Sequence, residues 1–284
     1  MKLGVMMPIL SSMSFGDALA YLSRLGVQAV EVGTGGYPGN VHLKGLEAAE
    51  IKSLLTKYDI EISALACHGN PVHPKPAVAQ QFHDDFMHTL EMAKMLGVGT
   101  IVTFSGCPGG CPSSTTPNWV SYARPAEWAE ILDYQWNDVL IPYWKKAANK
   151  AEEHGIKVAL EPHPNHCVHN HKTLLRLRDA TGEVIGANFD PSHMVWQGID
   201  PIWAIGELSG NIYHFHAKDI RVHKCGAWEF CSMGTGLSEH TWREMLKALK
   251  GAGYDGAISI EHSDAALPAL EGLEKAITFV KQVI

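Results

Sequence analysis

The chain has 284 residues, of which 46% are hydrophobic and 19% are charged, a composition typical of a folded globular protein. Its 23 Lys and Arg against 30 Asp and Glu give a net charge of −7, which argues against broad electrostatic binding to nucleic acid or to an anionic membrane. No apolar run approaches the roughly 18 residues of a membrane-spanning helix. The N-terminal sequence MKLGVMMPIL lacks the length and the cleavage site of a signal peptide, so we expect a cytoplasmic protein.

Short apolar runs alternate with longer segments of helical periodicity along the whole chain. Amphipathic helices are predicted at 46–58 and 82–96, among others. Glycines follow several helical segments where a C-terminal cap ends a helix: Gly26, Gly97, Gly155 and Gly253. The predicted strands, in chain order, are 3–7, 29–32, 62–68, 100–105, 157–161, 185–190, 212–218 and 256–262.

Eight repeats of strand, helix and glycine predict a (β/α)8 TIM barrel that forms one domain over residues 1–284. An open, doubly wound sheet is the alternative. It is disfavoured because no GxGxxG or GxxxxGK[ST] motif follows a strand. The GTGG segment at 33–36 opens no clear helix and is interpreted as a plain loop. The cysteine pairs Cys107–Cys111 and Cys225–Cys231 match no compact zinc site well, so we interpret the cysteines as free thiols.

Two long loops, 106–127 and 219–238, follow the fourth and seventh predicted strands. All loops after barrel strands open on one face, where barrel enzymes keep their active sites. Three tryptophans in rim loops, Trp119, Trp196 and Trp228, either stack against a substrate ring or pack the loops. An aromatic helix around 134–144 is interpreted as internal packing, with a contact between copies of the chain, and hence a homo-oligomer, as the alternative.

Polar side chains end the last four predicted strands. Strand five (KVALEPHP) ends in Glu161, strand six (IGANFDPSH) in Asp190, strand seven contains His216, and strand eight (GAISIEHS) ends near Glu261. Side chains alternate between the two faces of a strand, so small or polar residues such as Ala159 should share the inner face with these groups. The four residues are therefore expected to converge at the upper rim of the barrel.

Three carboxylates and an imidazole in one small pocket need a compensating cation, because like charges at close range repel. We therefore predict one divalent metal ion bound by Glu161, Asp190, His216 and Glu261. Oxygen-rich ligands with one imidazole favour Mn²⁺, with Mg²⁺, Co²⁺ and Zn²⁺ as alternatives.

The sequence resembles the xylose isomerase-like TIM barrels over nearly its whole length. This superfamily of metal-dependent sugar isomerases also includes ketose 3-epimerases, inosose dehydratases and endonuclease IV. The most specific segments are ALEPHP, GANFDPSHMVWQGIDP, HFHAKDIR and SIEHSD. By analogy with the ketose 3-epimerases, the four residues named above match the ligands of the single metal. The resemblance also implies that His193 and Arg221 bind substrate hydroxyls.

Two histidines complete the predicted site: His68 is expected to line the opposite wall, and His163 to contact the substrate. The other histidines of PHPNHCVHNH are explained by helix capping and surface exposure. Endonuclease IV-like DNA repair is disfavoured, because strand four ends in TFSG without a histidine and the net charge is negative. The second metal site of xylose isomerase proper is not clearly present, although Lys218 and Asp219 are weak candidates for part of it.

The predicted reaction moves a proton next to a carbonyl of a small carbohydrate substrate. The metal would polarise the ketone and stabilise the enediolate formed on deprotonation. Glu161 and Glu261 would act from opposite sides of the carbon, one taking the proton and the other returning it. The alternative is a lyase or dehydratase acting on a keto-sugar, keto-inositol or keto-glycoside. A metal-binding subunit of a larger complex is a further alternative.

Overall fold

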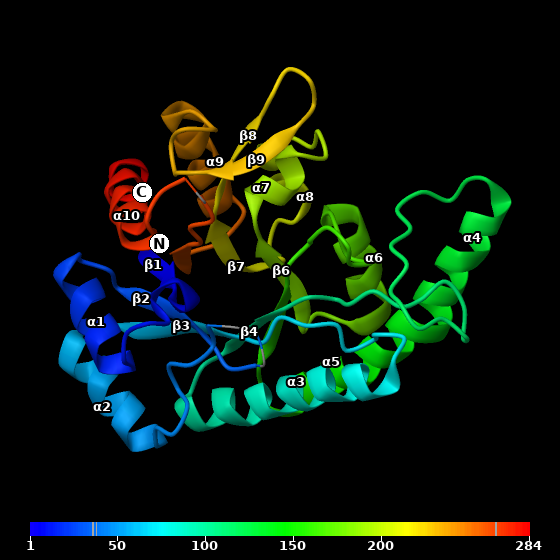
Figure 1. The fold of residues 1–284 in the computed structure, drawn as a ribbon, viewed down its shortest axis with the longest axis horizontal. Helices are drawn as coiled ribbons and strands as arrows, with labels where there is room; N and C mark the ends of the chain where they lie inside the picture. The colour runs from blue at the N-terminus through cyan, green and yellow to red at the C-terminus, as the bar shows by residue number, and fades with distance from the viewer. Residues whose placement is uncertain (36, 38, 265) are drawn as a thin grey trace.

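Eight parallel strands close into a barrel in the computed structural model, which describes residues 1–35, 37, 39–264 and 266–284 (Figure 1). Neighbouring strands around the barrel follow the order β1-β10-β7-β6-β5-β4-β3-β2. All eight predicted strands are confirmed, and most end one or two residues early, where the chain turns into the loops. Their bounds are β1 (Lys2–Met6), β2 (Ala29–Gly33), β3 (Glu61–Ala66), β4 (Thr100–Thr103), β5 (Lys157–Leu160), β6 (Ile185–Phe189), β7 (Ile212–Ala217) and β10 (Ala257–Ile260).

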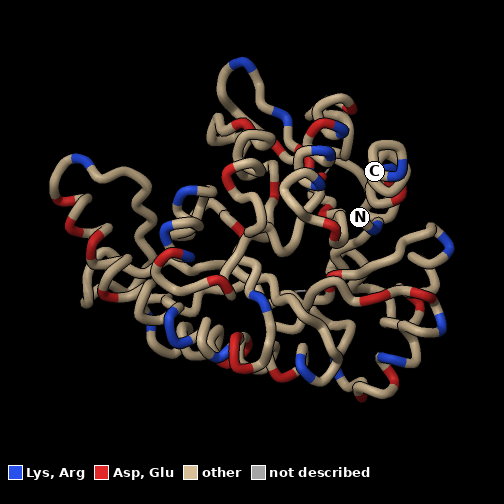
Figure 2. Tube along the Cα trace, turned by 180° about the vertical axis from the view of Figure 1, so that it is seen from behind, with Lys and Arg blue, Asp and Glu red and all other residues tan. Residues whose placement is uncertain are grey.

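Helices surround the barrel and connect its strands, as the repeat predicts (Figure 1). Lysines and arginines are interspersed with acidic residues over these outer helices (Figure 2). Gly97, with φ of 79°, ends α3 in the left-handed conformation expected of a glycine cap. The helices are α1 (Phe15–Arg24), α2 (Ala48–Tyr58), α3 (Pro76–Leu96), α4 (Ala126–Asp133), α5 (Ile141–Glu153), α6 (His171–Thr181), α7 (Pro191–Val195), α8 (Pro201–Glu207), α9 (Glu239–Gly251) and α10 (Ala269–Val283), with a 3-10 turn at Met7–Leu10 and a π-helix at Tyr134–Leu140.

The two faces of the strands carry different side chains. Val158 and Leu160 of β5 belong to the large hydrophobic core between strands and helices, whereas Ala159 packs inside the barrel with other small residues. This alternation confirms the assignment of faces from the sequence. Small side chains in the barrel interior leave room for the larger polar groups above them.

The loop at 219–238 is more ordered than the sequence indicates. It contains an antiparallel hairpin of β8 (Asp219–Val222) and β9 (Trp228–Cys231), which rises above the barrel (Figure 1). The loop at 106–127 is held by Gln135 of the π-helix, which donates to the backbone carbonyls of Gly109 (3.1 Å) and Asn118 (2.6 Å). Both elements shape the C-terminal rim.

The aromatic helix packs internally, because Trp136 and Trp144 are fully buried. All six cysteines are free. Among the described residues, no helix is both long and apolar enough to cross a membrane. The GTGG segment extends from the end of β2, and its last glycine lies outside the described residues.

Candidate metal centre and active site

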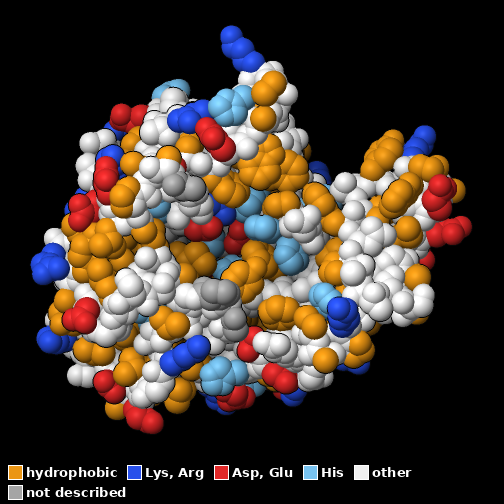
Figure 3. Space-filling model, viewed as in Figure 1, with side chains coloured by type: hydrophobic (Ala, Val, Ile, Leu, Met, Phe, Trp, Pro, Cys, Tyr) orange, Lys and Arg blue, Asp and Glu red, His pale blue; other side chains and the backbone are white. Residues whose placement is uncertain are grey.

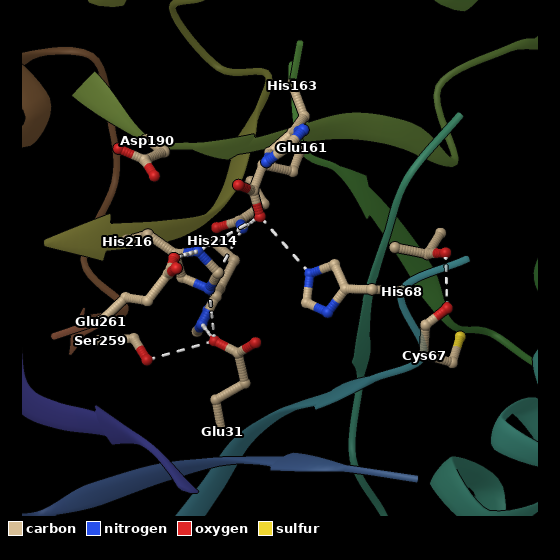
Figure 4. A network of polar contacts seen from close by, with 12 residues as sticks. Glu31, Cys67, His68, Glu161, His163, Asp190, His214, His216, Ser259 and Glu261 are labelled. Atoms are coloured by element: carbon tan, nitrogen blue, oxygen red, sulfur yellow. Dashed lines mark hydrogen bonds and ion pairs between the residues drawn. The ribbon is translucent and has the colours of Figure 1, made fainter. Parts of the chain in front are cut away.

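The four predicted ligands converge at the C-terminal mouth of the barrel (Figure 4). Glu161, Asp190 and Glu261 directly follow β5, β6 and β10, and His216 lies in β7. One ligand atom from each residue lies within 4.8 Å of those from the other three. The structure thus brings together the four residues that the strand-end pattern places at one rim.

His216 is held between two sets of carboxylates. Its Nε2 lies 2.7 Å from Glu31 Oε2, while its Nδ1 lies 3.3 Å from Glu161 Oε2 and 3.1 Å from Glu261 Oε2. Ionised Glu31 can only accept a hydrogen bond, so Nε2 donates to it. The Nδ1 atom therefore faces two carboxylate oxygens, and this arrangement is favourable only with a proton or a metal cation between them. Burial lowers the pKa of His216, but the charges of Glu31 and Glu161 outweigh it and raise this pKa well above its ordinary value.

Glu31 is a functional residue that the sequence analysis missed. It lies in β2, fully buried, and accepts hydrogen bonds from His214 Nε2 at 2.8 Å and Ser259 Oγ at 3.2 Å, in addition to His216. Burial opposes its ionisation, but the nearby histidines outweigh this effect and hold its pKa below the ordinary value. A carboxylate that accepts from the second nitrogen of a ligand histidine is the usual outer partner of a metal site. The available signal was a single acidic residue inside the apolar run AVEVG.

Glu161 is a buried ligand carboxylate surrounded by polar side chains. Its Oε2 accepts from Asn188 Nδ2 at 3.1 Å and lies 3.4 Å from His68 Nε2, and its Oε1 lies 3.2 Å from His193 Nε2. Burial raises its pKa, but the charge of His216 and the surrounding imidazole hydrogen bonds lower it well below the ordinary value. His68 and His193 therefore reach the site, as predicted.

Glu261 approaches the same nitrogen of His216 as Glu161 does, and it is the more accessible of these two glutamates, with 22% of its side chain exposed. Both its oxygens accept from Lys218 Nζ at 3.0 Å. Burial raises its pKa, but the charge of Lys218 and the hydrogen bond from His216 lower it to about 2. The two glutamates therefore differ in exposure: Glu161 is buried, whereas Glu261 lies at the edge of the centre.

Asp190 is oriented by the turn that follows it. Its Oδ1 accepts from the backbone N–H of Ser192 at 2.8 Å and caps the short helix α7. This leaves Oδ2 for the centre, where it lies 2.7 Å from Lys218 Nζ and 3.4 Å from His193 Nε2. Lys218, which the sequence analysis treated as a weak candidate, is therefore part of the cluster.

The histidines after β5 are not on the surface, which corrects the expectation of exposure. His169 and His171 are buried, and His163 and His166 are half-buried. Burial, the main cause, lowers the pKa of His163 to about 4 and that of His166 to about 3, so both rings are neutral at pH 7. The ring of His163 lies 4.4 Å from that of His193, and these two histidines form a second close group with Glu161.

Phe104 occupies the place at the end of β4 where no histidine was found. Its ring lies 4.5 Å from the rings of His68 and His163 and 4.4 Å from that of His166. It therefore replaces a possible ligand with an apolar surface that positions the surrounding imidazoles.

Arg221 does not join the cluster. It lies in β8, where its guanidinium is 2.9 Å from Glu229 Oε1 and also donates to the backbone carbonyl of Thr235. In the hairpin, Arg221 pairs with Glu229, whereas Ile220 pairs with Phe230. Alternation along the strands places these two pairs on opposite faces, and the face of Phe230 is the one that meets Lys218 and His193.

The three rim tryptophans lie together. Trp196 and Trp228 stack at 5.7 Å, Trp119 meets Trp196 edge-on at 6.5 Å, and Phe230 continues the series from Trp228 at 5.3 Å. The ring of Phe230 then lies 5.8 Å from His193. An aromatic wall thus connects the rim to the centre. Hydrophobic and histidine side chains border a hollow in which acidic groups are visible (Figure 3).

The donor set fits a divalent cation. It combines three carboxylates with an imidazole whose Nδ1 is aimed at two of them and whose Nε2 is fixed by Glu31. Such oxygen-rich sets with one imidazole suit Mn²⁺ and related ions, and zinc accepts the same ligand types. No cysteine belongs to a candidate metal group within the described residues.

A model of the xylose isomerase-like TIM barrel family matches residues 19–283. The chain belongs to this family. A curated relative, the uncharacterized protein YfiH of Bacillus subtilis, is 35% identical over an alignment of 312 residues that covers 100% of this chain and 99% of that protein.

Solved structures of this barrel type share the fold of the chain. IolI with a bound zinc atom superposes with a TM-score of 0.75 at 20% identity, covering 100% of this chain and 98% of that one. A D-tagatose 3-epimerase-like protein gives 0.71 at 22% identity with the same coverage. AsbF from Bacillus anthracis, described as a probable 3-DHS dehydratase, gives 0.73 at 17% identity and covers 99% of both chains.

Proposed function

We propose that this protein is a divalent-metal-dependent enzyme that epimerises or isomerises a sugar or sugar derivative by moving a proton next to a carbonyl. The observation that carries the proposal is the close group of Glu161, Asp190, His216 and Glu261, whose ligand atoms lie within 4.8 Å of one another. Membership of the family and the fold shared with a D-tagatose 3-epimerase-like protein support it.

Glu161, Asp190, His216 and Glu261 would hold the metal, with Glu31 fixing the imidazole from behind. When bound, the cation supplies positive charge that polarises a carbonyl and stabilises the negative charge that develops beside it. We favour Mn²⁺ from the ligand chemistry, and the zinc in the IolI structure makes Zn²⁺ the first alternative.

Glu161 and Glu261 would transfer the proton. Their Oε2 atoms lie 3.3 and 3.1 Å from the same atom, His216 Nδ1, and both carboxylates are held ionised, which is the form that can accept a proton. If one removes the proton from one face of a carbon and the other returns it to the opposite face, the centre is inverted. Return to a neighbouring carbon would isomerise the sugar instead.

His193, His68 and His163 would orient the substrate. His193 and His68 lie 3.2 and 3.4 Å from the two oxygens of Glu161, so a substrate atom that reaches this glutamate also reaches their imidazoles. His163 donates from Nδ1 to the backbone carbonyl of Pro164, which leaves its Nε2 as an acceptor for a hydroxyl. Arg221, which pairs with Glu229 in the hairpin, stays a predicted substrate contact.

Dehydration is the second candidate reaction. The same proton removal leads to elimination when a leaving hydroxyl lies beside the carbon that loses the proton. An inosose dehydratase of Clostridium beijerinckii is 25% identical over 215 residues, which cover 74% of this chain and 64% of that protein. AsbF adds a probable dehydratase with the same fold.

A metal and exchange assay tests the proposal. Purified protein is analysed for bound metal, stripped with EDTA, reloaded with Mn²⁺ or Zn²⁺, and incubated in D₂O with free ketoses, keto-inositols and sugar phosphates. We expect metal-dependent incorporation of deuterium next to the carbonyl of at least one substrate class. A new epimer identifies an epimerase, and loss of water identifies a dehydratase. Turnover that EDTA and the Glu161→Gln variant leave intact would refute the proposal.

A further inference from the structure

Lys218 directly follows β7 and places its ammonium inside the carboxylate cluster. Only 3% of the residue is exposed. Its Nζ lies 2.7 Å from Asp190 Oδ2 and 3.0 Å from both oxygens of Glu261. The amine therefore contacts two of the four residues that would hold the metal.

The surroundings leave this ammonium few other partners. Its Nζ lies 3.2 Å from His193 Nε2 and 4.9 Å from the centre of the Phe230 ring, a cation–π distance. In the part of the chain that the structure describes, Lys218 is the only lysine or arginine with an ion pair to Asp190 or Glu261. The positive charge of Lys218 therefore acts mainly on Asp190 and Glu261.

Two consequences follow from the position of this charge. An ammonium between Asp190 and Glu261 neutralises part of their repulsion, so the cluster can stay ordered without a metal. A divalent ion that binds the same oxygens is repelled by the ammonium, and the low dielectric of a buried site strengthens that repulsion.

We propose that Lys218 is a resident counter-charge that shares Asp190 and Glu261 with the divalent metal, keeps the metal-free cluster folded and lowers the affinity of the site for metal. The inference rests on the proposed metal centre. It makes the metal exchangeable, in contrast to a structural metal that the fold requires.

Titration of the metal-free protein with Mn²⁺ alone, by calorimetry, tests this inference in wild-type and Lys218→Met proteins. We expect the variant to bind Mn²⁺ at least tenfold more tightly and its metal-free form to melt several degrees lower. Damage to the site would weaken binding, so tighter binding is a readout that a merely structural role does not give. Lys218→Arg keeps the charge and should bind no more tightly than wild type.

Two further variants complete the design. Lys172→Met removes an exposed lysine that pairs with Glu207 on the outer surface and should change neither quantity. Lys218→Gln keeps a hydrogen-bond donor and replaces Lys218→Met if that variant does not fold. If wild type binds Mn²⁺ and the neutral variants bind no more tightly, the inference is wrong while the metal centre stands. If no protein in the series binds Mn²⁺ or Zn²⁺, the metal centre fails as well.

Discussion

Glu31→Gln should weaken the support of the metal centre without replacing any of the four predicted metal ligands. The substitution keeps the shape of the side chain but removes the charge that faces His214 and His216 at 2.8 and 2.7 Å. Because Glu31 is fully buried, no water replaces the lost interactions. Breaking a buried charge pair costs about 3–5 kcal/mol, and the retained amide oxygen places this change near the lower value.

A loss of about 3 kcal/mol corresponds to a fall in melting temperature of roughly 6–12 °C for a domain of this size. Loss of the outer partner of a ligand histidine should also weaken metal binding by about 10–100-fold. Thermal unfolding and calorimetric titration with Mn²⁺ measure the two effects separately.

The matched control is Glu61→Gln on the neighbouring strand β3, where the carboxylate is half-exposed and pairs with Lys2 at the other end of the barrel. This control should lower the free energy of unfolding by less than about 1 kcal/mol and leave metal affinity unchanged. If Glu31→Gln matched the control in both measurements, the assignment of Glu31 as the partner that orients His216 would be wrong.

Three further predictions concern the substrate side and a surface thiol. His193→Ala should lower kcat/KM by about 10²-fold or more, and unchanged kcat and KM would show that His193 only packs. Trp228→Leu should raise KM by roughly tenfold with little change in kcat, because Trp228 belongs to the aromatic wall; Trp203→Leu on the outer helix α8 is the control, and equal effects would rule the wall out. Cys111 is exposed, and hydrogen bonds from Ser113 and Ser114 lower its pKa to about 7. Its alkylation rate by iodoacetamide should therefore rise about tenfold from pH 6 to pH 8 and then level off, and Ser114→Ala should move that rise to higher pH; a rate still climbing steeply above pH 8 in wild type would contradict the shift.

The barrel and the position of its centre follow from local sequence patterns. Each strand shows a period of two, and parallel strands of a closed barrel all point their C-terminal ends to one rim. Polar residues at four successive strand ends must therefore meet, and Glu161, Asp190, His216 and Glu261 do.

The groups that complete the centre come from long-range packing, which a local pattern does not contain. Glu31 reaches His216 from a strand 185 positions away in the sequence. Lys218 shares the alternating face of His214 and His216, but its pairing with Glu261 depends on how β7 and β10 lie side by side. Arg221 lies on the other face of the hairpin from Phe230, and this placement depends on the pairing of β8 with β9, which is not apparent in a segment that reads as a long loop.

The central claim is that Glu161 and Glu261 move a proton on opposite faces of one substrate carbon. The most direct measurement is deuterium exchange in D₂O, followed by NMR for each epimer separately, with metal-loaded Glu161→Gln and Glu261→Gln proteins and the substrate found in the exchange assay. We predict that each variant lowers turnover by about 10²–10⁴-fold and retains exchange from one epimer only, with the two variants sparing opposite epimers. Equal and partial losses in both variants that added Mn²⁺ restores would mean that the glutamates only hold the metal, which would contradict the two-base account.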